Sequence, residues 1–336
     1  MEKPSLDTAK AGAMRFNTDS SQMEIYDGNQ WTGILATSTV QQTGGTRAFR
    51  GGGDTQPTFN DTIEFFNVDT AGNATDFGNL TEARTSVGQG WASRTRGFIA
   101  SGYNSGLGGY VNIIDFWTIT SNGNASDFGD MVAKKQGIGA LSSSTRGIIN
   151  TGSDASSPVN VIQYVTMAQT GNAVDFRDLY QQTLHQASGE SKTRGVIANG
   201  YTPSTSNVIQ YITMSTLGNS ADFGDATSGG YGASGCSNAV TMIFNIGYAG
   251  SHSTTMNSLT IPTLGDAVFF GDLTRTMYGP GTASSRTRGV LAGDYPSSSN
   301  VINYFQFANL GDGIDFGDLV SGRGHWGGSS NGHGGL

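Results

Sequence analysis

The sequence predicts an all-β fold of repeated four-stranded units, and three observations support this prediction. Glycine accounts for 51 of the 336 residues, about twice its usual share of ~7%, which favours many tight turns. Aromatic residues reach 10% and β-branched residues cluster in short runs, whereas disordered chains lack such groups because they cannot bury enough apolar area. A motif that ends in Asp-Phe-Gly-Asp returns along the chain. Short strands joined by glycine turns fit this pattern better than helices.

The phenylalanine of the closing motif gives the period of the repeat, 46 to 51 residues, and recurs as Phe77, Phe128, Phe176, Phe223, Phe270 and Phe316. Each repeat is expected to contain four strands: a small-residue strand such as residues 231–237, a Thr-Arg-Gly strand such as 193–198, an alternating strand such as 207–214, and a short strand that ends in Asp-Phe-Gly-Asp. Four short antiparallel strands per repeat are typical of the blades of a β-propeller. The small-residue strand would then line a crowded central channel.

The layout of the repeat resembles that of kelch repeats. Gly51, Gly52 and Gly53 match the kelch double glycine after the second strand, and Phe223 and its equivalents stand near the position of the kelch tryptophan. Phenylalanine replaces tryptophan in all six copies. The resemblance therefore implies a kelch-like β-propeller of divergent sequence.

The two ends of the chain are predicted to complete the ring. Residues 322–328 match the first strand of a further repeat, and residues 12–34 read as three more strands. We predict one propeller over residues 1–336, with an N-terminal arm (1–11), six repeats (35–319), and a seventh blade in which residues 12–34 pair with residues 320–336. Such closure removes exposed sheet edges. The alternative is six blades with an independent N-terminal β-hairpin.

Charge and composition narrow the partners. The net charge of −8 argues against nucleic acid and anionic membranes, which attract basic patches. No run of eighteen apolar residues occurs and the first residues are polar, so we expect no membrane insertion, no secretory signal peptide and synthesis in a cytoplasm. The lone Cys236 excludes an intrachain disulfide framework.

Matches to catalytic motifs are explained by the repeat. Asp-Phe-Gly occurs in one copy in kinases, together with other motifs, but here it recurs in most of the repeats. The Gly-x-Gly-x-x-Gly at 230–235 lacks the following helix of a dinucleotide site. The four histidines lie in different repeats without the spacing of metal ligands. We therefore predict no catalytic residues, no metal site and no cofactor, and a protein that is not an enzyme.

Repeated charged residues are expected to fasten the ring. The acids of the closing motifs would cap turns or pair with the arginines of the Thr-Arg-Gly strands, while calcium binding is the alternative. The residues concerned are Arg96, Arg146, Arg194 and Arg288, with Asp127, Asp130, Asp222, Asp225, Asp315 and Asp318.

A binding surface is expected where the repeats differ, in the loops between the second and third strands. These loops span residues 54–60, 104–110, 153–160, 202–206, 249–256 and 294–299. Ring side chains at their edges would suit stacking on carbohydrate, and the candidates are Tyr103, Tyr110, Tyr201, Tyr248, His252 and Tyr295. The alternative for each tyrosine is a role in the blade turn.

Two segments resemble proteins of tailed bacteriophages. Residues 12–31, from Gly12 to Trp31, are similar to a segment common in phage fibre and other virion proteins. The Gly-Asn-Ala-x-Asp-Phe-Gly-Asp-Leu elements look like those of marine phage structural proteins. The resemblance implies a virion component, such as a tail or neck fibre or a capsid-surface appendage. Its expected partners are other virion proteins, a host-surface glycan or protein, and further copies of the chain; a cytoplasmic kelch-type interaction scaffold is the alternative.

Overall fold

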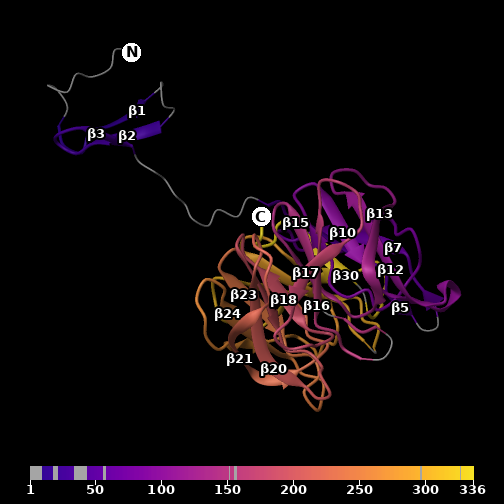
Figure 1. Cartoon of the computed structure of the whole chain (residues 1–336). Coiled ribbons are helices and arrows are strands. Elements are labelled where there is room, and N and C mark those ends of the chain that lie inside the picture. Colours follow the sequence, from indigo (N-terminus) through magenta and orange to yellow (C-terminus); the bar gives the residue numbers. More distant parts are fainter. Residues whose placement is uncertain are drawn as a thin grey trace. The chain divides into compact units, whose positions relative to one another are not determined.

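The computed structural model describes residues 10–17, 22–33, 44–55, 58–150, 152–154, 157–295, 297–325 and 327–336. These residues form β-strands and one short 3-10 helix, η2 (Ser105–Leu107), so the prediction of an all-β fold is confirmed (Figure 1). The chain divides into two compact units, Met1–Gln41 and Gln42–Leu336. Within the described residues no helix is long and apolar enough to span a bilayer.

The smaller unit is a three-stranded antiparallel sheet of β1 (Met14–Asn17), β2 (Gln22–Tyr26) and β3 (Trp31–Gly33). Side chains alternate between the two faces of a strand, and Met14 and Phe16 lie opposite Ile25 and Met23. All four of these apolar side chains are exposed, Met14 by 65%. On the other face Arg15 pairs with Glu24 at 2.7 Å. This sheet therefore presents one apolar face to solvent.

Among the described residues, the larger unit contains six main antiparallel sheets; five have four strands, and the second also has a short fifth strand, β11 (Tyr103–Asn104), beside its third strand. The sheets are numbered in chain order of their second strands, and the four main strands of each are given from the innermost outward. Sheet 1 is β30 (Gly327–Ser330), β4 (Arg47–Gly51), β7 (Thr62–Asn67), β8 (Thr75–Asn79); sheet 2 is β9 (Trp91–Ala92), β10 (Arg96–Ala100), β12 (Gly109–Thr118), β13 (Ser126–Lys135); sheet 3 is β14 (Gly139–Ser142), β15 (Arg146–Asn150), β16 (Val161–Thr166), β17 (Val174–Asp178). Sheet 4 is β18 (Ala187–Glu190), β19 (Arg194–Ala198), β20 (Ser206–Thr213), β21 (Ala221–Gly230); sheet 5 is β22 (Gly235–Ser237), β23 (Thr241–Asn245), β24 (Thr255–Thr260), β25 (Val268–Asp272); sheet 6 is β26 (Gly281–Ser284), β27 (Arg288–Ala292), β28 (Val301–Gln306), β29 (Ile314–Asp318). The short strands β5 (Asp54–Thr55), β6 (Thr58–Phe59) and β11 (Tyr103–Asn104) extend the loops.

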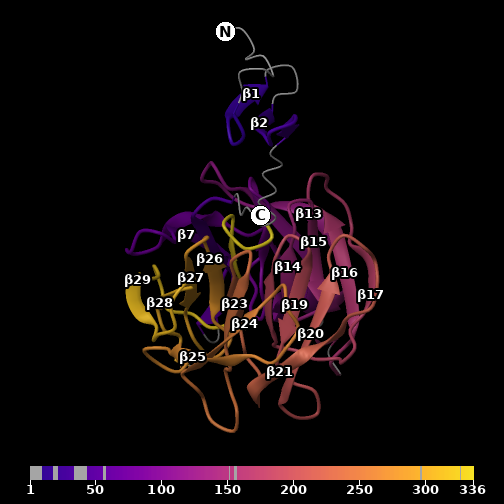
Figure 2. The ribbon, with the colours of Figure 1, turned by 90° about the vertical axis from the view of Figure 1, so that its left-hand side faces the viewer.

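The apolar residues of each repeat build the core between neighbouring sheets. The Thr-Arg-Gly strands are buried after their arginine, as in β19 and β27. The phenylalanine of each closing motif is also buried, and Phe316 of sheet 6 packs edge-on against Phe66 of sheet 1 at 5.5 Å between ring centroids. In Figure 2 the strands β26, β27, β28 and β29 follow one another from the interior toward the edge of the larger unit. The sheets thus pack face to face, which is compatible with a β-propeller.

The innermost strands lie close together, as the small-residue pattern predicted. In the sequence β9, β14, β18, β22, β26 and β30, each strand contacts the next, and β30 contacts β9. A Cβ atom at Gly328 would stand 2.4 Å from the backbone nitrogen of Thr282, and one at Gly235 would stand 2.8 Å from the carbonyl oxygen of Ser188. Glycine is required at these positions because the neighbouring backbones leave no room for a side chain.

Neighbouring sheets are joined by a hydrogen bond that recurs at every junction. The backbone N–H of the fifth residue of the fourth strand donates to the side-chain oxygen of an Asn or Asp that precedes the fourth strand of the next sheet. The donor–acceptor pairs are Asn79–Asn124, Asp130–Asn172, Asp178–Asn219, Asp225–Asp266, Asp272–Asp312 and Asp318–Asn73. The last pair joins sheet 6 to sheet 1, and it gives a structural role to Asn73, which begins a potential glycosylation sequon.

A second recurring bond uses a polar residue in the middle of each third strand. Its side-chain oxygen accepts a backbone N–H from the preceding sheet, and the donor–acceptor pairs are Val320–Glu64, Thr81–Asp115, Val132–Gln163, Gln181–Gln210, Thr227–Asn257 and Thr274–Asn303. Where this residue is acidic, a buried arginine from the preceding repeat pairs with it: Arg84 lies 2.9 Å from Asp115, and Arg323 lies 3.2 Å from Glu64. Burial lowers the pKa of both arginines, and the carboxylates oppose this effect.

The predicted pairing of residues 12–34 with residues 320–336 does not occur among the described residues. Within the described residues β1, β2 and β3 pair only with one another, whereas β30 pairs with β4, Gly327 opposite Gly51. Residues 322–328 do lead into an innermost strand, as predicted, but it completes the sheet of the first repeat. The reason is that Gly327–Ser330 have the small side chains that the crowded innermost position requires, since a Cβ atom at Gly328 would stand 2.4 Å from the backbone nitrogen of Thr282. The alternative of six sheets with separate N-terminal strands agrees with this pairing; residues 1–9 of the predicted arm lie outside the described residues.

The predicted pairing of repeat arginines with repeat aspartates does not occur among the described residues. Each arginine instead donates to a backbone carbonyl of the next sheet and lies over an aromatic ring of its own third strand: Arg96 to Met167, Arg146 to Met214, Arg194 to Ile261 and Arg288 to Asp69, over Phe116, Tyr164, Tyr211 and Tyr304. Carbonyl oxygens at the end of the third strand are available acceptors at every junction, so the arginine joins neighbouring sheets without a carboxylate.

Candidate binding site at the aromatic end

The inner strands define two ends of the larger unit. We call one the aromatic end, where the connections into the innermost strands carry Tyr231 and Tyr278, and the other the tail end, where residues 331–336 lie. The two are opposite because the hairpins that join first and second strands, at 285–287 for example, lie at the tail end.

At the tail end the last residues pack against the innermost strands. The Nδ1 atom of His333 lies 2.6 Å from Glu190 Oε1, and its Nε2 atom lies 2.9 Å from the carbonyl oxygen of Ala92. Leu336 is fully buried. The chain also enters the larger unit at this end, where the N–H of Gly45 donates to the carbonyl oxygen of Asn331 at 2.5 Å. The tail end is therefore occupied by the chain itself.

The aromatic end carries a continuous set of rings, which we call the aromatic cluster. Its members are His185, Tyr201, Tyr231, Tyr248, His252, Tyr278, Tyr295 and His325. Tyr278 is central, with ring centroids 5.6 Å from Tyr231, 5.9 Å from His252 and 6.0 Å from Tyr295. Burial, and then the nearby Tyr231 and Tyr295, raise the pKa of Tyr278 well above its usual value, so its hydroxyl stays protonated at neutral pH.

Backbone bridges between loops bring these rings together. Tyr231 and Tyr248 exchange N–H···O bonds of 3.1 and 2.8 Å, and the N–H of Tyr295 donates to the carbonyl oxygen of Tyr278 at 3.2 Å. One member of each pair precedes an innermost strand, and the other follows a second strand. The rings are therefore positioned by the repeat itself, and the cluster exists because sheets 4 to 6 carry tyrosine at these positions.

Of the six candidate residues, the structure places four in the aromatic cluster: Tyr201, Tyr248, His252 and Tyr295. Tyr103 and Tyr110 instead pack on each other at 5.4 Å, and Tyr103 contacts Phe59. Sequence reasoning missed Tyr231 and Tyr278, which join the aromatic cluster. The signal was available, because each stands immediately before a glycine at the same place in its repeat.

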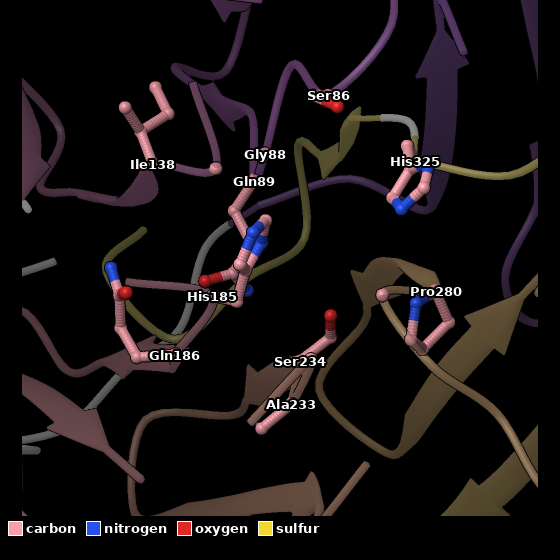
Figure 3. A pocket seen from close by; sticks show the side chains of 13 residues that line it. Ser86, Gly88, Gln89, Ile138, His185, Gln186, Ala233, Ser234, Pro280 and His325 are labelled. Atoms are coloured by element: carbon pink, nitrogen blue, oxygen red, sulfur yellow. The ribbon is translucent and has the colours of Figure 1, made fainter. Parts of the chain in front are cut away.

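A small depression opens beside the aromatic cluster, on the axis of the inner strands (Figure 3). Its free volume is about 30 Å³, room for one or two water-sized groups. The lining residues include Ser86, Gln89, His185, Gln186 and His325, and no Lys, Arg, Asp or Glu is among the residues that line the depression. Burial lowers the pKa of His185 to about 4, so this imidazole is neutral at physiological pH.

The backbone at this rim is strained. Six equivalent turn positions have φ between 52° and 66°; three are glycines (Gly137, Gly232, Gly279), and the others are Ser86, His185 and His325. A side chain in this left-handed region costs about 1–2 kcal/mol relative to glycine. Unusual backbone of this kind is concentrated at functional sites. The two histidines therefore occupy positions where packing alone would favour glycine.

The acids of the closing motifs do not gather into a metal site. Asp222 and Asp315 are exposed, and the carboxylate of Asp127 accepts the N–H of Gly129 at 3.0 Å. The N–H groups of Asp130, Asp225 and Asp318 make the bonds between sheets described above. In the part of the chain that the structure describes, no three His, Cys, Asp or Glu side chains lie together as metal ligands. The calcium alternative thus has no clustered ligand set there.

Comparison with known proteins adds no family to these observations. No protein-family model matches the chain, and no curated protein is significantly similar to it. The aromatic end and its depression are therefore interpreted from their own chemistry.

Proposed function

We propose that this chain is a non-enzymatic component of a bacteriophage virion, and that it binds a host-surface glycan through the aromatic end of a six-bladed, kelch-like β-propeller closed by β30. Supporting six blades, both recurring bonds between sheets also join sheet 6 to sheet 1. The virion assignment is supported by the resemblance of residues 12–31 and of the repeats to phage structural proteins.

The aromatic cluster is the observation that carries the binding proposal. Sugar rings stack their C–H faces on aromatic side chains, which provide rigid contact area at a low cost in side-chain entropy. Tyr201 and His252 are exposed, while Tyr231, Tyr248 and Tyr295 are partly exposed. Rings that served only the stability of the fold would be buried, whereas these side chains are accessible to solvent at the aromatic end.

The smaller unit supports attachment to another virion protein. The exposed face of Met14, Phe16, Met23 and Ile25 is apolar, and exposed apolar faces of this kind often mark interaction sites. Burying such a face against a partner is favourable by about 25 cal/mol per Å².

The binding proposal is tested with the full chain on a glycan array. Tyr201→Ala and His252→Ala each remove one exposed ring and are expected to weaken binding about fivefold, the value of roughly 1 kcal/mol for one aromatic contact. Tyr180→Ala is the matched control, because Tyr180 is 68% exposed and makes no ring contact within the aromatic cluster. Failure of the wild-type chain to bind any glycan would refute the binding proposal.

The virion proposal is tested separately by mass spectrometry of purified particles from the phage that encodes the chain. We expect peptides of both units in the particle at a fixed ratio to the major capsid protein. Absence of the chain from intact, infectious particles would refute this assignment.

A further inference from the structure

The depression at the aromatic end offers two buried hydrogen-bond acceptors without a donor. The Oε1 atoms of Gln89 and Gln186 accept no hydrogen bond from the described residues, although these side chains are only 7% and 2% exposed. A buried acceptor left unpaired is costly, and such atoms usually have a partner.

The orientation of both amides is fixed by their nitrogens. Gln89 Nε2 donates across the inner strands to the carbonyl oxygens of Gly235 at 2.9 Å and Ser188 at 3.3 Å. Gln186 Nε2 donates to Asn150 Oδ1 at 2.7 Å. Neither amide can turn over without losing these bonds, so each presents its oxygen elsewhere. Both residues line the depression, and Figure 3 shows Gln89 at its centre beside His185.

The electrostatics of the depression favour an uncharged ligand. No Lys or Arg lines it to balance a carboxylate, and no Asp or Glu lines it to balance an ammonium ion. His185 is neutral because of burial. Burying an unbalanced charge is unfavourable, whereas a hydroxyl group donates to an amide oxygen at no such cost.

We infer that the depression receives the hydroxymethyl group of a neutral hexose, whose hydroxyl donates to the Oε1 atom of Gln186 while the sugar ring lies against the aromatic cluster. This inference rests on the proposed glycan binding and specifies the sugar class. A hydroxymethyl group has two heavy atoms and matches a free volume of about 30 Å³. A uronic acid, with a carboxylate in the same place, would meet two oxygen acceptors and no cation.

The test compares matched sugars on the full chain by titration calorimetry. Glucose, galactose and mannose are each presented at the end of an oligosaccharide in three forms: the hexose, its uronic acid and its 6-deoxy derivative. We expect at least one hexose to bind, with its uronic acid at least tenfold weaker and its 6-deoxy derivative about 3- to 10-fold weaker, the effect of one neutral hydrogen bond.

Two variants locate the effect in the depression. Gln186→Met removes the acceptor and should weaken hexose binding about 3- to 10-fold while leaving the 6-deoxy sugar unchanged. His185→Gly should weaken both sugars and still fold, because three equivalent turns already carry glycine with the same φ. Gln169→Met, at an exposed position, is the control, and circular dichroism checks that each variant folds.

The outcomes separate this inference from the proposed function. If the wild-type chain binds no sugar, both fail. If it binds the uronic acid as well as the hexose, or if Gln186→Met has no effect while Tyr201→Ala weakens binding, the inference about the depression is overturned and glycan binding at the aromatic cluster stands.

Discussion

The buried pair of Arg84 and Asp115 allows a quantitative test of how the sheets are joined. Both side chains are fully buried and lie 2.9 Å apart, and Asp115 also accepts hydrogen bonds from the backbone N–H and the hydroxyl of Thr81. At the equivalent two positions, the junction between sheets 5 and 6 carries neutral residues. There Asn303 accepts the same two bonds from Thr274, and Met277 stands at the position of Arg84 in its repeat.

The expected changes in the free energy of unfolding follow from the comparison of these two junctions. Arg84→Met leaves the Asp115 carboxylate buried without its partner, which should lower the free energy of unfolding by about 3–5 kcal/mol. Asp115→Asn leaves the arginine unpaired at a similar cost. The double variant reproduces the junction between sheets 5 and 6, and removing a buried pair in favour of well-packed neutral groups is often neutral. We therefore expect it to lie within about 1 kcal/mol of the wild-type chain.

The assay is chemical denaturation of all four proteins, followed by circular dichroism, with the coupling energy obtained from the double-mutant cycle. A large favourable coupling is the expected result. If the double variant loses as much stability as the sum of the two single variants, the residues do not act as a pair and the equivalence of the two junctions is wrong.

Three further predictions concern the rest of the fold. Lys135 stands at the position of Arg84 in its repeat, but it faces a junction where Gln163 replaces the acid. Burial lowers the pKa of Lys135 to about 8, so Lys135→Met should raise the free energy of unfolding at pH 7 by about 1–3 kcal/mol. A loss of stability in this variant would show that the ammonium group has a compensating partner. His185 has a pKa of about 4 in the folded chain against roughly 6.5 when unfolded, so the unfolded state binds more protons as the pH falls through this window. The free energy of unfolding should drop by up to about 2 kcal/mol between pH 7 and pH 5; this is an upper limit because the His185 ring is partly exposed. Thermal unfolding of the wild-type chain and of His185→Gly across this pH range should show a smaller drop in the variant. Deleting residues 1–43 should leave the unfolding transition of the larger unit unchanged in calorimetry. Deleting residues 327–336 removes the innermost strand of sheet 1, including the hydrogen bond from the N–H of Arg47 to Asn331, and should abolish cooperative unfolding. The reverse pattern would show that the N-terminal strands contribute to the larger unit.

Much of the fold could be predicted from the sequence because it depends on local, repeated chemistry. The period of the phenylalanines, the alternation of residues 207–214 and the small residues of 231–237 indicated four strands per repeat, and the sheets have that order. The end of the segment 322–328 also lies in an innermost strand, which runs over Gly327–Ser330. These features depend on which side chains suit a strand or a tight approach, and each repeat carries that information within about fifty residues.

The partners of these elements were decided only by the tertiary structure. Which strand β30 completes, which carbonyl each repeat arginine reaches, and which tyrosines share one cluster all depend on residues up to 284 positions apart. The sequence named Tyr201, Tyr248, His252 and Tyr295 as candidates, but only the bridges between loops brought Tyr231 and Tyr278 between them. A repeat specifies its own strands, whereas the packing of the sheets against one another sets the contacts between repeats, and the candidate site lies where the starts of the innermost strands come together.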